Sequence, residues 1–358
     1  MGCFMKKVLT ITGIRPDFIR MSELFKKLDK EFDHTLIHTG QHYDNLLSDV
    51  FFKELDIRKP DYNLGIGGPG KEHFHQSAEA SVKIIELLRD KKIKPNIIIF
   101  LGDSNSVVTS VALKKEGYFI GHIEAGMRSG DRRMLEEINR TVCDHCSDLH
   151  FVYHEDYKEN LIQEGLPAKN IYVVGNTIVE VCNNLKAGIM SKPKAKDFIL
   201  VDIHRPENFK YKNRLDNILK LANFCKGRFG ISVRMLRFGR TMLSIEDFGL
   251  NTGGIEFVDL MPYKQFLKAQ YDSLFLISDS GTAQEEPALL KTPVLVPRDY
   301  TERPQSAWAG CSFMLNIASP GEFKSAVTWL NSNPEMDNSW LGDGTTSEQI
   351  IEILKDRL

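Results

Sequence analysis

Three carboxylates and one arginine in the first half of the chain have the types and spacing that acid–base chemistry needs. Asp103 and Glu124 each follow a short apolar run, where a buried strand would end. Glu136 and Arg140 lie four positions apart, so on a helix they would share a face and could form an ion pair. Carboxylates held near a cation inside a protein can give and take protons. The alternatives are a helix cap for Asp103 and a surface ion pair for Glu136.

A second group of residues, near the amino end, suits the binding of an anion. Arg15 comes two positions after Gly13 and directly before Pro16, and proline favours the first turn of a helix. Both arginine side chains and the amino ends of helices bind phosphate. The alternative for Arg15 is a surface ion pair with Asp17. His42 follows the next apolar run beside Gln41, and there hydrogen bonding to a ligand is favoured over metal binding. A metal site would need a third ligand at a familiar spacing.

In the second half of the chain, small residues run directly into a predicted helix at 285–290. The backbone N–H groups of Ser280, Gly281 and Thr282 would point at an anion, and the helix dipole would favour it. Glu286 could accept hydrogen bonds from ribose hydroxyls. The segment matches neither GxGxxG nor GxxxxGKS or GxxxxGKT, so a dinucleotide-cofactor site and a P-loop are not supported. The pattern predicts a nucleoside diphosphate site.

Short apolar runs rich in Val and Ile alternate with amphipathic helical segments along the chain. Such runs are typical of strands buried on both faces of a parallel sheet, and the alternation indicates βαβ units. In these folds ligands bind at the carboxyl ends of the strands, where the polar residues above lie. The predicted strands are 8–12, 35–38, 97–101, 119–123, 149–153, 171–174, 198–203, 231–236, 255–258, 274–277 and 293–296. The predicted helices are 77–89, 136–146, 215–225, 285–290 and 345–358.

The predicted fold class is α/β, with two Rossmann-like doubly wound domains facing a central cleft. The alternation pauses between Val181 and Lys196, in a stretch with Gly, Ser and Pro, which predicts a hinge. We therefore expect an amino-terminal domain at 1–182 that carries the acid–base residues. A second domain at 183–344 would bind the nucleotide. The helix at 345–358 would pack back on the first domain.

The composition limits the functional classes. The chain has 358 residues, with 46 Lys and Arg against 48 Asp and Glu, and a formal net charge of -2. With 42% hydrophobic and 26% charged residues, it is not disordered, collagen-like or a coiled coil. The balanced charge lacks the footprint of a nucleic-acid binder, and no apolar run approaches the roughly 20 residues that span a membrane. Six scattered cysteines and the lack of a signal-peptide pattern predict a cytoplasmic protein with reduced thiols.

Taken in order, these segments resemble the UDP-N-acetylglucosamine 2-epimerase family, in its non-hydrolysing bacterial type. The resemblance covers nearly the whole chain, and the ordered set of motifs is specific although no single motif is decisive. It implies the two-domain fold of the GT-B type. The motifs that carry it are GIRPDFIRM, HTGQHYD, GDSNS, HIEAGMRSG, EEINR, GNT, HRPEN, SDSGTAQEE, RDYTERP and GDG.

The resemblance also implies a reaction and a set of site residues. The family removes the C2 proton of a UDP-N-acetylhexosamine and expels UDP, which re-adds to a 2-acetamidoglucal with protonation on the other face. No cofactor and no metal is implied, and a homodimer is favoured. The implied catalytic residues are Asp103, Glu124, Glu136, Arg140 and His204. The implied substrate-binding residues are Arg15, His42, Ser278, Ser280, Gly281, Thr282, Glu286 and Arg303.

Several positions depart from the usual family pattern. Asp17 and Arg20 stand where Glu and Lys are usual, and Thr282 replaces the second glycine of SDSGG. The segment 128–136 is shorter than usual, which resembles relatives that act on modified UDP-amino sugars. The stretch 233–240 lacks the usual His. The resemblance therefore does not extend to the allosteric site that UDP-GlcNAc-activated members form there.

Three other functions are open on the sequence. A hydrolysing 2-epimerase would release UDP and a free sugar of the N-acetylmannosamine type. A glycosyltransferase of the same fold would need an acceptor site, of which the sequence gives no sign. A UDP-sugar-binding protein without catalysis would not need Asp103, Glu124 and Glu136.

Overall fold

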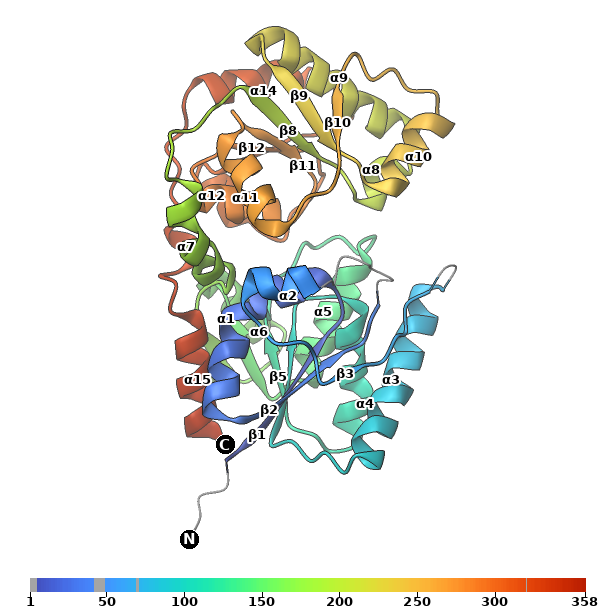
Figure 1. Cartoon of the computed structure of the whole chain (residues 1–358), viewed down its shortest axis with the longest axis vertical. Helices are drawn as coiled ribbons and strands as arrows, with labels where there is room; N and C mark the ends of the chain where they lie inside the picture. Colours follow the sequence, from blue (N-terminus) through green and yellow to red (C-terminus); the bar gives the residue numbers. More distant parts are fainter. Residues whose placement is uncertain (1–4, 42–48, 69–70, 320) are drawn as a thin grey trace. The chain divides into compact units, whose positions relative to one another are not determined.

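The computed structural model describes residues 5–41, 49–68, 71–319 and 321–358 (Figure 1). The chain divides into two compact units: unit 1 comprises Met1–Val181 and Leu341–Leu358, and unit 2 comprises Cys182–Trp340. Each unit is built on one parallel sheet whose strands alternate with helices along the chain. The predicted α/β class with two doubly wound sheets is confirmed.

The sheet of unit 1 has seven parallel strands in the order β3-β2-β1-β4-β5-β6-β7. The order reverses between β1 and β4, so the loops after these two strands diverge and leave room for a ligand at their carboxyl ends. Strand β4 is buried along its whole length, as its sequence IIIFL predicts. The strands are β1 (Lys7–Thr12), β2 (Asp33–His38), β3 (Tyr62–Asn63), β4 (Ile97–Leu101), β5 (Ile120–Ile123), β6 (Leu149–Val152) and β7 (Ile171–Val173).

The sheet of unit 2 has six parallel strands in the order β10-β9-β8-β11-β12-β13. Here the order reverses between β8 and β11, and the loops that follow these strands carry the residues predicted to bind a nucleotide. Strand β8 is buried throughout. The strands are β8 (Phe198–Asp202), β9 (Ser232–Leu236), β10 (Glu256–Val258), β11 (Leu276–Ser278), β12 (Val294–Val296) and β13 (Ser312–Met314).

The helices bury the faces that their apolar spacing predicts. In α1 (Arg15–Glu31), Phe18, Met21, Phe25 and Leu28 recur at helical intervals and are all buried. No helix in the described ranges has both the length and the hydrophobicity of a membrane span. The other helices of unit 1 are α2 (Asp49–Leu55), α3 (His73–Asp90), η1 (Asn105–Thr109), α4 (Ser110–Lys115), α5 (Leu135–Cys146), α6 (Glu155–Gln163), η2 (Ala168–Asn170) and α15 (Thr346–Arg357). Those of unit 2 are α8 (Pro206–Phe209), α9 (Lys212–Phe229), α10 (Gly239–Asp247), α11 (Tyr263–Asp272), η3 (Thr282–Gln284), α12 (Glu286–Leu289), α13 (Pro304–Trp308) and α14 (Glu322–Asn331).

The terminal helix α15 belongs to unit 1, where it packs against α1. Its residues Ile350 and Leu354 are fully buried. At the amino end of α15, the carboxylate of Glu180 accepts the backbone N–H of Ser347 at 2.8 Å. The last residues of the chain thus complete the core around the first helix.

One local prediction is wrong in part, and the sequence pattern misses two short strands. The predicted domain division after residue 182 lies beside the observed one between Val181 and Cys182. The predicted hinge at 181–196 is nevertheless helical over its first half, because helix α7 (Ile178–Ile189) crosses this boundary. The predicted helix at 285–290 is observed as α12, a single helical turn at Glu286–Leu289 that follows the 3-10 helix η3. Strands β3 and β13 lie at sheet edges and have only two and three residues.

Candidate active site

At the carboxyl end of β4, Asp103 lies against a buried arginine. Gly102, which directly precedes Asp103, has a left-handed φ of 73° and turns the chain away from the strand. Arg140, on α5, is 2% exposed, and its guanidinium pairs with the Asp103 carboxylate. Asn139 donates to the Asp103 carbonyl at 2.9 Å. Because Ser104 occupies the N-cap of η1, the Asp103 side chain is an ion-pair partner rather than a helix cap.

Arg140 has a second buried partner, Glu137, which the sequence pattern does not reveal. Nη1 of Arg140 lies 3.2 Å from Oε2 of Glu137. The same carboxylate accepts the backbone N–H groups of Ser129 and Gly130, each at 3.0 Å. Glu137 therefore connects the loop before α5 to this arginine. Glu136, the predicted partner, lies half-buried in the first turn of α5.

Glu124, after β5, is held in a strained and buried position. Its φ of 69° lies in the left-handed region, which costs a non-glycine residue about 1 kcal/mol. Its side chain is 3% exposed and pairs with Arg20 of α1. The Arg20 guanidinium lies 5.5 Å from the centre of the Tyr153 ring, and the Tyr153 hydroxyl bonds to Thr177 at 2.9 Å. Arg20 was not predicted because helical spacing does not indicate which distant carboxylate a basic residue will meet.

The turn after β1 packs closely on the loop after β4. Gly13 is required there, because a Cβ would lie 2.4 Å from Oγ of Ser104. Arg15 opens α1 and is half-buried, with its guanidinium 5.0 Å from the centre of the Phe51 ring. The predicted anion-binding arginine is thus at the point where the strand order reverses. His42, the other residue predicted in this region, lies outside the described residues.

Asp17, in the first turn of α1, is a buried carboxyl group with an altered acidity. Its Oδ2 accepts the backbone N–H groups of Gly13 at 2.7 Å and Ile14 at 3.1 Å. Burial raises the pKa of Asp17 to about 7, and the nearby charge of Asp103 adds to the rise, while the two backbone hydrogen bonds oppose it. Near neutral pH this group therefore exchanges between its acid and its carboxylate forms.

In unit 2, His204 follows β8 and is oriented by two aspartates. Its Nδ1 lies 2.9 Å from Oδ1 of Asp202, and its backbone N–H donates to Asp279 at 3.0 Å. Burial lowers the pKa of His204, but the neighbouring negative charges, Asp202 foremost, outweigh it and raise the pKa above its ordinary value. The side chain is 33% exposed and packs on Phe238. An accessible histidine biased toward its cationic form suits an anionic ligand.

The loop after β11 is ordered by its own hydroxyl groups. Oγ of Ser278 donates to Asp202 at 3.1 Å and accepts the backbone N–H of Ser280 at 3.1 Å. The hydroxyls of Ser280 and Thr282 lie 3.1 Å apart. The N–H of Ser280, predicted to face an anion, is thus used within the loop. In the part of the chain that the structure describes, the N–H groups of Gly281 and Thr282 donate to no protein acceptor.

Buried charges support this loop from beneath. A Cβ on Gly281 would lie 2.6 Å from Nη1 of Arg303. Arg303 is 3% exposed, with Nε 2.5 Å from Glu285 and Nη1 2.6 Å from Glu302. Glycine therefore lets the loop rest directly on an arginine fixed by two glutamates. Direct contact between Arg303 and a ligand stays a prediction.

Glu286 begins α12 and is held by two side chains of α11. The Tyr263 hydroxyl donates to Oε1 at 2.9 Å, and Nε2 of Gln270 donates to Oε2 at 2.8 Å. The carboxylate is 3% exposed and fixed in orientation, as a hydrogen-bond acceptor for a ribose would need to be. Because α12 has a single turn, its dipole contributes less to anion binding than the sequence predicts.

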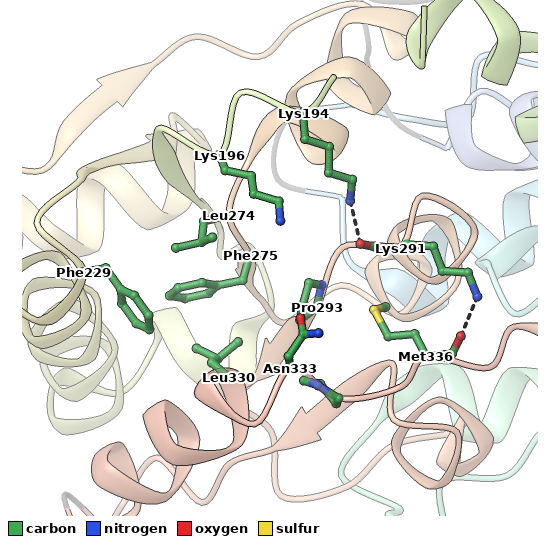
Figure 2. Close-up of a pocket in the computed structure, with 11 residues that line it drawn as sticks. Lys194, Lys196, Phe229, Leu274, Phe275, Lys291, Pro293, Leu330, Asn333 and Met336 are labelled. Carbon is green, nitrogen blue, oxygen red and sulfur yellow. Dashed lines mark hydrogen bonds between the residues drawn. The ribbon is translucent and has the colours of Figure 1, made fainter. Parts of the chain in front are cut away.

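A pocket of about 240 Å³ lies at the amino-terminal ends of the unit 2 strands (Figure 2). It is lined by Lys196, Phe275 and Pro293, which come just before β8, β11 and β12. Lys194, at its rim, donates to the carbonyl of Lys291 at 2.6 Å. Ligands of doubly wound sheets bind at the carboxyl ends of strands, so this pocket is separate from the candidate site.

Each unit thus has a doubly wound sheet with polar groups at the carboxyl ends of its strands, an arrangement typical of α/β enzymes that bind nucleotides. The chain belongs to the UDP-N-acetylglucosamine 2-epimerase family, because the family model of that description matches residues 26–355. The predicted family and the predicted enzyme class, an isomerase, are confirmed.

Relatives from archaea and bacteria align over nearly the whole chain. UDP-N-acetylglucosamine 2-epimerase of Methanocaldococcus jannaschii is 32% identical, over 97% of this chain and 98% of the relative. UDP-2,3-diacetamido-2,3-dideoxy-D-glucuronate 2-epimerase of Pseudomonas aeruginosa is also 32% identical, over 97% of this chain and 99% of the relative. The crystal structure of the Methanocaldococcus jannaschii enzyme in complex with UDP-GlcNAc and UDP superimposes with a TM-score of 0.88, covering 98% of this chain and 99% of that one.

The Arg20–Glu124 pair should contribute strongly to stability. Replacing Arg20 with Met should lower the free energy of unfolding by about 3–5 kcal/mol, because Glu124 loses the arginine that offsets its burial. The double variant Arg20→Met/Glu124→Gln should regain part of this loss. Urea unfolding of the wild type, both single variants and the double variant measures the coupling. Lys26→Met, which removes a half-exposed partner of Glu23 on the same helix, should have little effect. Equal losses for Arg20→Met and Lys26→Met would contradict the assignment.

The acidity of Asp17 should appear in the pH dependence of stability. Its folded pKa of about 7 lies above the unfolded value of 3.8, so the folded state binds the extra proton and this group destabilises the fold as pH rises between these values. The cost amounts to about 4 kcal/mol by pH 8. Asp17→Asn keeps the amide-accepting oxygen and should remove this dependence. Urea unfolding of both proteins from about pH 5 to 8 tests it; parallel curves would contradict the shift.

Proposed function

We propose that this chain inverts C2 of a UDP-linked N-acetylhexosamine by eliminating UDP and adding it back. The observation that carries the proposal is the placement of Asp103 and Glu124 at the ends of the neighbouring strands β4 and β5, each against a buried arginine. Family membership and the related structure with UDP-GlcNAc and UDP support the choice of substrate.

The chemistry requires a base and a leaving group together. The C2–H bond of the sugar is not acidic, so a positioned carboxylate must take the proton while the C1–O bond to UDP breaks. A C1–C2 double bond forms, and UDP leaves with the electrons of the C1–O bond. In the return step C2 is protonated from the other face and the C1–O bond forms again. Asp103, Glu124 and Glu136 are the candidates for the two proton transfers. The scheme fits any assignment in which one of them removes the C2 proton and another delivers a proton to C2.

Unit 2 supplies the groups that would bind UDP. His204, biased toward its cation, and the N–H groups of Gly281 and Thr282 would stabilise the charge on the diphosphate. Glu286, fixed by Tyr263 and Gln270, would accept the ribose hydroxyls. Arg15, in unit 1, is a further candidate for the diphosphate. We propose a homodimer and a cytoplasmic location on the family resemblance alone.

Incubation with UDP-sugars in D₂O, followed by NMR, tests the reaction. The substrates are UDP-GlcNAc and UDP-2,3-diacetamido-2,3-dideoxy-D-glucuronate, the compounds in the names of the two relatives. We expect one of them to reach an equilibrium of two UDP-sugar epimers with deuterium at C2. Release of UDP and free sugar would indicate a hydrolysing enzyme. No turnover of either substrate would leave a transferase or a binding protein as the better account.

Removal of either carboxylate should stop exchange without affecting nucleotide binding. Asp103→Asn and Glu124→Gln should each lower the rate of C2–H exchange at least about 100-fold, because proton transfer by a positioned group contributes that much or more. Calorimetry should show UDP affinity unchanged. Glu116→Gln, which removes an exposed partner of Arg89 in the same unit, should exchange at the wild-type rate. If both Asp103→Asn and Glu124→Gln also exchange at that rate, these residues are not the acid–base groups.

Gly281 should be necessary for UDP binding. In Gly281→Ala the new Cβ would meet the guanidinium of Arg303, which two buried glutamates hold in place, so the loop must move. We expect UDP affinity to fall about 10-fold or more, equivalent to about 1.4 kcal/mol. Gly239→Ala is the matched control, since no atom lies within 4 Å of its added Cβ. Similar UDP affinities for the two variants in calorimetry would argue against the loop as the phosphate site.

A further inference from the structure

His122 is a fully buried histidine on β5 whose two ring nitrogens both contact acceptors. Nδ1 lies 2.6 Å from Oδ1 of Asp144, and Nε2 lies 2.8 Å from the carbonyl oxygen of Gly102. Both His122 and Asp144 are 0% exposed. None of the roles assigned so far uses either residue.

The partners define the charge of His122. A carbonyl oxygen only accepts hydrogen bonds, so Nε2 must carry a proton. Oδ2 of Asp144 accepts the backbone N–H of Gly126 at 3.1 Å and lies 2.8 Å from Arg128, which marks the carboxyl group as ionised. Nδ1, facing the other oxygen of that carboxylate, must then also carry a proton. The ring is an imidazolium cation.

The acidities of the two groups agree with this assignment. Burial lowers the pKa of His122, but Cys143 and Asp144 on α5 outweigh it and raise the pKa well above its ordinary value. Burial raises the pKa of Asp144, but His122 and Arg128 lower it to about 2. A further titratable neighbour is His150 on β6, which lies opposite His122 in the sheet register. Burial lowers the pKa of His150, which keeps it neutral.

The ion pair reaches both turns that carry the proposed acid–base groups. Gly102, whose carbonyl His122 holds, immediately precedes Asp103. Gly126, whose N–H Asp144 holds, comes two positions after Glu124. Glycine allows the left-handed φ values of 73° at Gly102 and 76° at Gly126, whereas the φ of 69° at Glu124 is unfavourable for a residue with a side chain and must be maintained by surrounding contacts.

We propose that His122 and Asp144 are positioning residues for the reaction: their buried ion pair fixes the two turns so that Asp103 and Glu124 keep the relative placement that proton transfer needs. This inference rests on the proposed function. It assigns the pair no contact with the substrate, and its effect passes through the Gly102 carbonyl and the Gly126 amide.

Substitution of His122 tests the proposal through a separation of kcat from KM. His122→Asn keeps a donor near the Nδ1 position and loses the contact with Gly102. We expect kcat for C2–H exchange to fall about 10- to 100-fold, as when the group that orients an active-site ligand is removed, with KM and UDP affinity unchanged. His122→Gln, which restores a donor near the Nε2 position, should recover part of the rate.

His150→Gln is the matched control, because His150 lies beside His122 on the next strand and its ring donates to the Asp144 carbonyl at 2.8 Å. The ring of His150 is not bonded to either turn, so His150→Gln should lower the free energy of unfolding without lowering kcat. A wild-type kcat in folded His122→Asn, or equal losses of kcat in His122→Asn and His150→Gln, would overturn the proposal.

NMR of the ring nitrogens supplies a readout on the wild-type protein. Both nitrogens of His122 should stay protonated from about pH 6 to 8, the range in which an ordinary histidine titrates, whereas His150 should carry one proton. One unprotonated nitrogen in His122 would overturn the assignment, and if no His122 variant folds this measurement alone decides. Asp103→Asn, assayed in parallel, separates the two claims. If Asp103→Asn exchanges C2–H at the wild-type rate, the proposed site is wrong. If His122→Asn exchanges at that rate while Asp103→Asn does not, only the positioning role is wrong.

Discussion

Two buried arginines hold the candidate acid–base carboxylates at the carboxyl ends of the unit 1 strands. A carboxylate taken out of water is costly unless a cation and hydrogen bonds compensate it, and the Glu124 side chain is 3% exposed. Arg20 reaches it from α1, and Arg140 reaches Asp103 from α5, so each helix must pack in register with the strands for its own carboxylate to be tolerated. The packing of Phe18 and its helical neighbours in α1, and of α15 against α1, therefore has a direct consequence for the chemistry.

Unit 2 also contains a buried arginine paired with carboxylates, here beneath a loop and not at the end of a strand. Arg303 is fixed between Glu285 and Glu302, and Gly281 allows the loop backbone to approach it. His204 is in turn oriented by Asp202. In both units, charged groups that are already paired fix the shape of the candidate site, so the proposed reaction would need little reorganisation when charge develops on the departing diphosphate.

Much of the fold could be predicted because buried parallel strands read as continuous apolar runs. The strands up to β12 follow from such runs, apart from the edge strand β3, which has only two residues. The domain division was predicted to within one residue, but the helix α7 that continues through it was not, because no local signal marks a boundary inside a helix. Strand ends also identified Asp103, Glu124 and His204 as candidates. The sequence could not indicate Arg20 or Glu137, whose partners are chosen by packing between elements distant in the chain.

The proposed reaction requires that the bond between C1 and UDP breaks while a carboxylate takes the C2 proton. Positional isotope exchange measures this directly, with a UDP-N-acetylhexosamine labelled with ¹⁸O in the oxygen that joins C1 to the β-phosphorus and ³¹P NMR as the readout. We expect the label to spread to the non-bridging oxygens of the β-phosphate as UDP leaves and returns. Deuterium incorporation at C2 with the label still wholly in the bridging position would contradict it.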